Sequence, residues 1–313
     1  MVLNFSSFTR TFITGSLFFA LVVISPFACA AVYPMPLYGD DVVGNTSTIT
    51  VVRGDSIRKI RMKYGISFDE MIAANPDLDY EPIRTGDILT LPTQYILPQH
   101  RRGIVLNMPE LRIYYFTPDG KYVYTFPVAM GRPEWRTPTM ATKIVGKQEN
   151  PTWYVPKSVH AYMLRAHNLD LPNIMPPGPD NPLGNYALYL ARPGFVIHGT
   201  NQQETVGTFA SSGCMRLSSS AIETLFKHVK IGAPVHIIHH TNKAGWLGDA
   251  LYLEVHEPIE LDEKPSELNT TSINGVILNE VASHPAKIYW DKVYEVVANH
   301  DGIPHVIGEA VNN

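Results

Sequence analysis

A series of short β-prone runs between Gly103 and Ile238 constrains the fold of this chain more strongly than any other feature. The runs are rich in Val, Ile, Tyr and Phe, and turn residues such as Pro118-Asp119-Gly120 separate them. They span residues 104–107, 112–116, 122–128, 187–190, 195–197 and 235–238. Such spacing predicts a mainly antiparallel β-sandwich or barrel. One helical period interrupts it, and Ser220 is its expected N-cap.

Two smaller units are expected on either side of this region. Upstream, the pattern predicts the order strand, helix, helix, strand, with strands over residues 48–52 and 88–91 and a linker over 93–102. Downstream of residue 240, we expect a strand over 250–255, then an acidic loop and a helix over 286–299. The chain is therefore expected to be α+β, with a small βααβ module, a sandwich or barrel domain and a small C-terminal α/β extension.

Length and charge agree with a multidomain protein that does not bind polyanions. A chain of 313 residues exceeds what one small core usually organises. Its 25 Lys and Arg are outnumbered by 29 Asp and Glu, whereas nucleic-acid-binding proteins usually carry a clustered basic surplus. We therefore expect no nucleic-acid partner.

The first 30 residues are typical of a secretory signal peptide. They contain one base, Arg10, and an apolar stretch over residues 12–24 that is too short to span a membrane. The stretch is followed by Ala28-Cys29-Ala30, a small-x-small pattern that predicts cleavage between Ala30 and Ala31. A lipoprotein signal on Cys29 is the alternative, although Pro26 stands where such a signal has an aliphatic residue. We expect an exported protein with no membrane span.

A strand-end histidine and a single thiol are the chemically informative residues. Cleavage would leave Cys214 as the one cysteine, so it has no partner for an internal disulfide. An apolar run delivers His198 at its end, and Gly213 allows a tight turn just before the cysteine. A cysteine nucleophile needs a base, and amides in such a turn can bind an oxyanion. Arg216 lies two residues after Cys214, and its planar guanidinium is suited to bind a substrate carboxylate.

These residues resemble the catalytic motif of the L,D-transpeptidases of the YkuD fold. The similarity covers His198-Gly199-Thr200, Ser211-Ser212-Gly213-Cys214-Met215-Arg216-Leu217 and the segment Pro176-Pro177-Gly178-Pro179-Asp180-Asn181-Pro182-Leu183-Gly184. The resemblance implies a catalytic domain over residues 101–240 and an extension over 241–313. It also implies a cysteine acyltransferase that needs no metal or organic cofactor.

The resemblance implies a role for each matching residue. Cys214 would be the nucleophile, His198 the base and the Gly199 carbonyl the group that orients the imidazole. The Gly213 and Cys214 amides would form the oxyanion hole. The substrate-binding residues would be Arg216, Ser212 and Thr200. Ser212 departs from the many relatives that have a histidine there, so no role of that histidine is transferred.

Residues 47–93 resemble a LysM module, which binds N-acetylglucosamine chains. The matching anchors are Gly54-Asp55-Ser56-Ile57, Ala74-Asn75-Pro76, Gly86-Asp87-Ile88-Leu89 and Leu91-Pro92. The implied glycan groove is formed by the first two anchors and by residues up to Ile83. The alternative is that the module only spaces and orients the catalytic domain.

The order of signal, LysM module, catalytic domain and extension is similar to that of periplasmic enzymes that attach Braun lipoprotein to peptidoglycan. The implied reaction transfers the meso-diaminopimelate carbonyl of a tetrapeptide stem, with loss of D-alanine, to the terminal lysine of a lipoprotein. The alternatives are 3→3 cross-linking, hydrolysis by an L,D-carboxypeptidase and a non-catalytic glycan-binding wall protein. Carbapenem β-lactams are expected to acylate Cys214.

Three further features of the sequence each have a functional and a purely structural interpretation. His236, His239 and His240 suggest zinc, but no cysteine or helical histidine pair accompanies them, so we expect no metal site. The aromatic residues that either line the substrate cleft or pack in the core are Trp135, Trp153, Tyr154 and Tyr162. The proline-rich interval over residues 151–185 is long enough to form a lid or a substrate wall.

Overall fold

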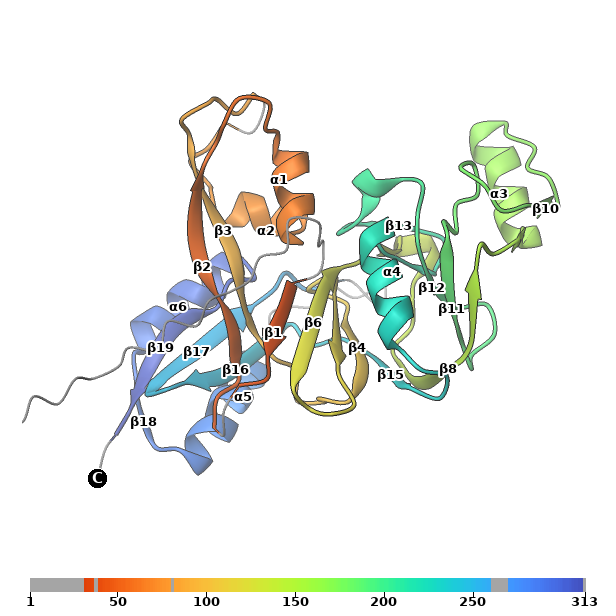
Figure 1. Cartoon of the computed structure of the whole chain (residues 1–313). Coiled ribbons are helices and arrows are strands. Elements are labelled where there is room, and N and C mark those ends of the chain that lie inside the picture. Colours follow the sequence, from red (N-terminus) through yellow and green to blue (C-terminus); the bar gives the residue numbers. More distant parts are fainter. Residues whose placement is uncertain (1–30, 37–38, 80–81, 260–269, 312–313) are drawn as a thin grey trace, which may run out of the picture.

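The computed structural model describes residues 31–36, 39–79, 82–259 and 270–311. They form an N-terminal module (residues 42–96), a central domain (103–238) and a C-terminal module (242–310), and Figure 1 shows the N-terminal module standing above the junction of the other two. This confirms the α+β prediction. The predicted signal peptide and most of the acidic loop lie outside the described residues. Among the described helices, none is both long and apolar enough to cross a bilayer.

One large mixed sheet organises the central domain. Within the described residues its strand order is β1-β6-β5-β4-β15-β8-β11-β12-β14. Most neighbours are antiparallel, as predicted, whereas β4 pairs with β15 and β12 with β14 in parallel. Its strands are β1 (Ala31–Pro34), β4 (Gly103–Asn107), β5 (Arg112–Phe116), β6 (Tyr122–Pro127), β8 (Met140–Glu149), β11 (Tyr186–Leu190), β12 (Val196–His198), β14 (Met215–Arg216) and β15 (Pro234–Ile238).

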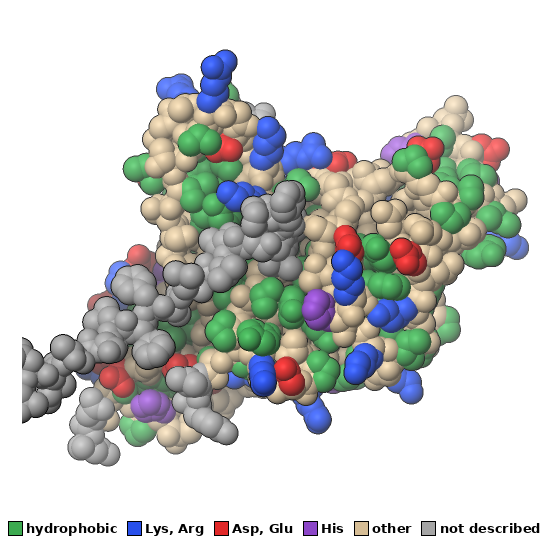
Figure 2. All heavy atoms as spheres, viewed as in Figure 1, with side chains coloured by type: hydrophobic (Ala, Val, Ile, Leu, Met, Phe, Trp, Pro, Cys, Tyr) green, Lys and Arg blue, Asp and Glu red, His purple; other side chains and the backbone are tan. Residues whose placement is uncertain are grey.

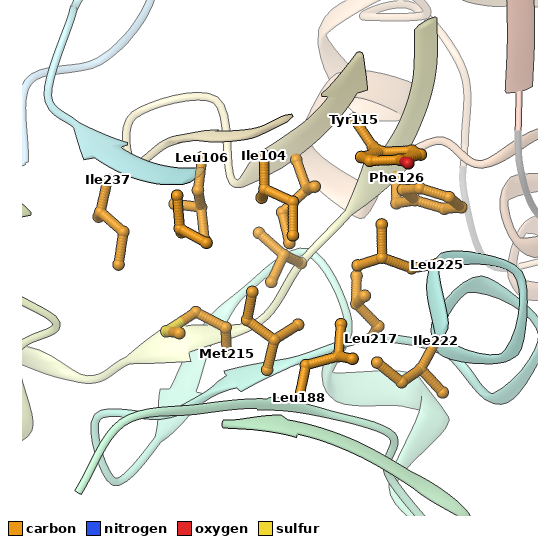
Figure 3. Close-up of a cluster of buried hydrophobic side chains, with 14 of the residues drawn as sticks. Ile104, Leu106, Tyr115, Phe126, Leu188, Met215, Leu217, Ile222, Leu225 and Ile237 are labelled. Carbon is orange, nitrogen blue, oxygen red and sulfur yellow. The ribbon is translucent and has the colours of Figure 1, made fainter. Parts of the chain in front are cut away.

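The core of the central domain lies between the curled sheet and α4 (Ser219–His228). Figure 3 shows Ile222 and Leu225 of α4 directed toward Leu188 and Leu217, all fully buried. Each such side chain contributes about 1.5–3 kcal/mol through burial. The predicted N-cap was wrong by two residues, because Ser218 caps the helix by accepting a hydrogen bond from the Ala221 amide at 3.2 Å.

Short elements complete the central domain. The strand β7 (Met130–Gly131) pairs in parallel with β13 (Phe209–Ser211), and β9 (Trp153–Tyr154) pairs with β10 (Ile174–Met175). Between β9 and β10 lies α3 (Lys157–His167), which projects from the end of the domain in Figure 1. The 3-10 turns are η1 (Pro133–Trp135) and η2 (Gln203–Thr205). The proline-rich interval therefore has structure of its own.

The N-terminal module has the predicted order strand, helix, helix, strand. Its elements are β2 (Val42–Thr50), α1 (Ile57–Tyr64), α2 (Phe68–Ala73) and β3 (Ile88–Ile96). The predicted strand over 48–52 was too short and displaced, because β2 pairs with β3 from Val42 opposite Ile96 to Thr50 opposite Ile88. The predicted linker was also wrong at its start. Tyr95 and Ile96 remain in β3, where they are buried.

Buried charged side chains fasten the N-terminal module to the central domain. Arg112 of β5 forms an ion pair with Glu70 of α2, and its guanidinium also donates to the Gly65 carbonyl at 3.2 Å. Arg61 of α1 donates to the carbonyls of Val206 at 3.2 Å and Glu204 at 3.1 Å. The module is thus docked on the segment that follows β12.

The C-terminal module is a four-stranded antiparallel sheet, among the described residues, covered by helices. Its elements are β16 (Asn242–Leu247), β17 (Ala250–Val255), α5 (Thr270–Ser283), β18 (Ala286–Ile288), α6 (Trp290–Asn299) and β19 (His305–Ala310). The predicted strand over 250–255 is confirmed. The predicted helix over 286–299 was wrong at its start, because residues 286–288 pair with β19 and the helix begins at Trp290.

A buried charge cluster joins this module to the central domain. The Lys243 ammonium lies 2.9 Å from a carboxylate oxygen of Glu110 and 2.8 Å from one of Glu254. Glu254 also accepts a hydrogen bond from the Ile96 amide at 3.0 Å. The cluster therefore holds the C-terminal module, β3 and the central sheet together.

Candidate active site

Two parallel strands bring the predicted catalytic residues together. In the register of β12 and β14, Ile197 lies opposite Met215 and His198 lies opposite Arg216. Cys214 immediately precedes β14. The imidazole, the thiol and the guanidinium all line one cavity of about 820 Å³. The sequence pattern predicted this convergence, and the topology provides it.

The turn before the thiol is built by hydroxyl groups. Gly213 has φ +102°, a conformation that favours glycine. Thr137 Oγ1 accepts from the Gly131 amide at 3.1 Å and donates to the Gly213 carbonyl at 2.9 Å. Ser211 Oγ accepts from the Gly213 amide at 3.1 Å and donates to the Cys214 carbonyl at 2.5 Å. The Gly213 amide, a predicted oxyanion donor, is thus engaged by Ser211 in this state.

His198 is buried as a neutral imidazole. Its Nδ1 donates to the Gly199 carbonyl at 2.6 Å, so Nε2 is the nitrogen that can accept a proton. Burial and the charge of Arg216 lower the pKa of His198 to about 3, against the raising effect of the Gly199 and Leu183 carbonyls. Gly199 therefore holds the imidazole as the resemblance implied.

The Cys214 thiol is also neutral. Burial raises the pKa of Cys214, and a backbone hydrogen bond with Val196 and the charge of Arg216 oppose this only in part. The thiol donates to the Gly194 carbonyl at 3.6 Å rather than to the imidazole. The resting pair is therefore thiol and imidazole.

The three predicted substrate-binding residues differ in position. Arg216 lines the cavity, where Nη1 donates to Gln202 Oε1 at 3.3 Å and the buried Nε has no hydrogen-bond partner among the described residues. Ser212 also lines the cavity, and its hydroxyl lies 3.4 Å from Arg132 Nη2. Thr200 is buried, and its Oγ1 accepts from the Gln202 amide at 2.9 Å. Thr200 thus shapes the loop behind Arg216.

The proline-rich interval forms one wall of the cavity. From it, Trp153, Val159 and Met163 line the cavity, together with Trp135 from η1. Tyr162 packs edge-on against Trp135 with ring centroids 6.0 Å apart, whereas Tyr154 of β9 is 71% exposed.

Asn181 closes this wall onto the domain. Its buried side-chain amide donates to the carbonyls of Pro151, Met175 and Pro176 at 2.9 to 3.2 Å. The bonds tie the start of the interval and its last third to one side chain. The sequence motif that contains Asn181 did not predict this role.

The predicted glycan residues of the N-terminal module are largely engaged in its own fold. Ser56 Oγ accepts from the Lys59 amide at 3.3 Å, and Asp55 accepts from the Val52 amide at 3.0 Å. The buried side chain of Asn75 bonds the Thr90 carbonyl and amide at 2.9 and 2.7 Å. Of the other predicted glycan-binding residues, Gly54 and Pro76 are exposed, Ile57 is buried and Ile83 is half-buried. Figure 2 shows Lys and Arg side chains at the end of the N-terminal module that points away from the other two modules.

Among the described residues, His236, His239 and His240 do not belong to a group of His, Cys, Asp and Glu side chains that could hold a metal ion. His236 stacks on His100 with ring centroids 4.7 Å apart. The possible ligand group among the described residues is instead Glu110, Glu254 and His256. The Lys243 ammonium already supplies the positive charge there.

Comparisons with known proteins found similar chains and domains. Residues 101–237 match the family model of the L,D-transpeptidase catalytic domain, YkuD, and residues 49–92 match that of the LysM domain. The chain is 39% identical over 247 residues to the probable L,D-transpeptidase ErfK/SrfK of Escherichia coli K12, covering 77% of this chain and 79% of that protein. It is 37% identical over 263 residues to the probable L,D-transpeptidase YcfS of the same strain, covering 81% and 82%. Among solved structures, an Ldtfm-avibactam carbamoyl enzyme is 22% identical with a TM-score of 0.36, covering 51% of this chain and 55% of that one.

Proposed function

Because the chain belongs to the L,D-transpeptidase family, we propose that Cys214 is its acyl-transfer nucleophile and His198 the base that activates it. The observation that most directly supports these roles is that the buried neutral imidazole of His198, oriented by the Gly199 carbonyl, lines the same cavity as the Cys214 thiol. A neutral base is required here, because an imidazolium could not accept the thiol proton.

The proposed first step makes a thioester. As Sγ of Cys214 bonds to the carbonyl carbon of the third stem residue, the thiol proton passes to Nε2 of His198. The tetrahedral oxyanion is bound by the Cys214 amide and by that of Gly213, which leaves Ser211 Oγ for this purpose. The carbon–nitrogen bond to D-alanine then breaks, and the imidazolium returns the proton to the leaving amine.

The second step regenerates the thiol. An amine attacks the thioester, its proton passes through His198 to the sulfur, and the acyl group leaves on the new amide. We propose that the amine is the terminal lysine of a Braun-type lipoprotein and that the reaction takes place in the periplasm on peptidoglycan. Three features support this proposal: the signal-like first 30 residues, the LysM match and the similarity to ErfK-type relatives over most of the chain.

The acceptor is tested with purified enzyme, peptidoglycan carrying tetrapeptide stems, and a peptide that ends in lysine. We expect mass spectrometry of digested peptidoglycan to find the peptide joined to diaminopimelate, and to find none with Cys214→Ala. Joined stems without peptide would favour 3→3 cross-linking, and stems shortened by D-alanine alone would favour hydrolysis. Sedimentation with peptidoglycan without any product would favour a binding protein. Carbapenem acylation of Cys214, which we also propose, is read from the mass of the intact enzyme.

A further inference from the structure

We propose that Arg132, with the hydroxyls of Tyr162 and Ser212, forms a second carboxylate-binding subsite beside Cys214, distinct from Arg216. The proposal deepens the proposed function, on which it rests. It assigns to the enzyme a donor peptide with carboxylates on both sides of the amide that is cleaved.

Arg132 is aimed into the catalytic cavity by its own contacts. Nη1 lies 3.1 Å from the Tyr162 hydroxyl, and Nη2 lies 3.4 Å from Ser212 Oγ. The Arg132 Cζ lies over the Tyr162 ring, 4.3 Å from its centroid. The two hydroxyl contacts use two of the five N–H donors of the guanidinium, so further donors remain to take a carboxylate.

The backbone of Arg132 is fixed to the turn that carries the thiol. Its amide donates to the Ser211 carbonyl at 3.1 Å, and its carbonyl accepts from the Trp135 amide at 2.8 Å. Gly131 packs so tightly that an added Cβ would lie 2.0 Å from the Trp135 carbonyl oxygen. A guanidinium held in this way is preorganised relative to Cys214, as a binding subsite requires.

The charges of the cavity favour an anionic ligand. Arg132 and Arg216 both line it, and each has a buried Nε with no hydrogen-bond partner among the described residues. Neither guanidinium forms an ion pair within the part of the chain that the structure describes, where Asp180 is the one acid in the cavity lining. Two uncompensated cations in one partly desolvated cleft are costly, so a ligand with two carboxylates would stabilise both.

The proposed donor supplies these two groups. One is the terminal carboxylate of D-alanine, which lies on the leaving side of the scissile amide. The other is the free carboxylate at the far end of the diaminopimelate side chain, on the acyl side. Each fits a planar guanidinium, and amidation of either group removes its charge with little change in size.

The experiment compares three soluble tetrapeptides: the unmodified donor, its diaminopimelate carboxamide and its D-alaninamide. Each is turned over by wild-type enzyme and by Arg132→Gln, Arg132→Lys and Arg136→Gln. Arg136 is the matched control, because it lies on the same loop but bonds its own Pro133 carbonyl at 3.1 Å. Thermal unfolding of every variant reports whether the fold is kept.

We expect Arg132→Gln to lower kcat/KM for the unmodified donor by about 10- to 100-fold, the effect of losing one charge-assisted contact. With one of the two amides the same substitution should cost almost nothing, because its partner charge is already absent, and this identifies the bound carboxylate. Arg132→Lys should restore part of the loss, and Arg136→Gln should behave as wild type.

An equal loss of kcat/KM for all three donors would overturn the subsite, because Arg132 would then act through the fold. No loss with any donor would overturn it as well. Failure of the proposed function has a different signature: wild-type enzyme would form no acyl-enzyme at Cys214 with the unmodified donor.

Discussion

Arg112 of the central sheet and Glu70 of the N-terminal module form a bidentate ion pair, with Nη2 2.6 Å from Oε1 and 2.7 Å from Oε2. The Arg112 side chain is 1% exposed. Burial alone would lower the pKa of Arg112, but the Glu70 carboxylate raises it above its usual value. The Arg112–Glu70 ion pair therefore joins the two units, because the Arg112 guanidinium could not stay buried without the Glu70 carboxylate.

Replacing Glu70 by alanine should destabilise the whole protein, because it leaves the Arg112 guanidinium buried without a counter-ion. We expect a loss of about 3–5 kcal/mol in the free energy of unfolding, measured by chemical denaturation. Arg58→Ala is the control, since it breaks an exposed pair with Glu204 at 3.9 Å and should cost about 0–1 kcal/mol. Equal losses of stability from the two substitutions would contradict the claim that the Arg112–Glu70 pair holds the N-terminal module on the central domain.

Arg61→Ala should lower catalysis on substrates that contain no glycan. Arg61 holds the carbonyls of Glu204 and Val206 in the segment that joins His198 to the Cys214 turn. Loss of these charge-assisted bonds, worth roughly 1.5–3 kcal/mol each, should loosen that segment and reduce kcat/KM on a soluble tetrapeptide by about tenfold. Unchanged turnover of the soluble peptide, with weaker peptidoglycan binding alone, would show that the module acts only as an anchor.

Alkylation of Cys214 should follow an alkaline pH profile. Burial raises the pKa of this thiol above the ordinary value of 9.0 and lowers that of His198 to about 3, so no thiolate–imidazolium pair exists at neutral pH. The iodoacetamide rate in the free enzyme should therefore be low at pH 7 and rise above pH 9. A reactive plateau across neutral pH would indicate an ion pair instead.

His198 should also make stability depend on pH. The unfolded chain binds a proton at this imidazole below its ordinary pKa of 6.5, whereas the folded protein does so only near pH 3. Folding therefore loses stability as pH falls from 6.5 toward 3. A His198→Gln variant should show a shallower acid slope in thermal unfolding, and an unchanged slope would refute the burial of a neutral imidazole.

Gly213→Ala should separate strain from catalysis. Gly213 has φ +102° and Gly120 has φ +70°, and an added Cβ meets no atom closer than 3.4 Å at either position. Both alanine variants should lose about 1–3 kcal/mol of stability through backbone strain. Only Gly213→Ala should also lower kcat, because it shifts the turn that carries the nucleophile. Parallel kcat values for the two variants would argue against a catalytic role for this turn.

Most of the fold, and the placement of His198, Cys214 and Arg216 at one cavity, could be predicted because the signals are local. The strands are indicated by short runs of β-branched and aromatic residues between turn residues. The segments around His198 and Cys214 carry glycines at recognisable positions. Helix α5 could not be predicted in this way. Asn274-Gly275 in its middle predicts a turn. The segment is nevertheless helical, because the helix buries Ile273 and Ile277 against the C-terminal sheet.

The parts of the site that escaped prediction depend on contacts between distant segments. Ser211 and Arg132 come together because β7 pairs with β13, and nothing local in either segment encodes that pairing. The hydrogen bond from Thr137 to the Gly213 carbonyl likewise spans 76 residues of sequence. Side chains that position a catalytic turn from another strand become visible only when the strands are placed.

The most direct test of the account is the intact mass of the enzyme after incubation with a tetrapeptide stem and no amine. We expect a single adduct equal to the stem minus D-alanine, released by hydroxylamine, mapped to Cys214 by peptide mass spectrometry and missing in a folded Cys214→Ala variant. Release of D-alanine by that variant, or an adduct on another residue, would contradict the claim that this sulfur carries the acyl group.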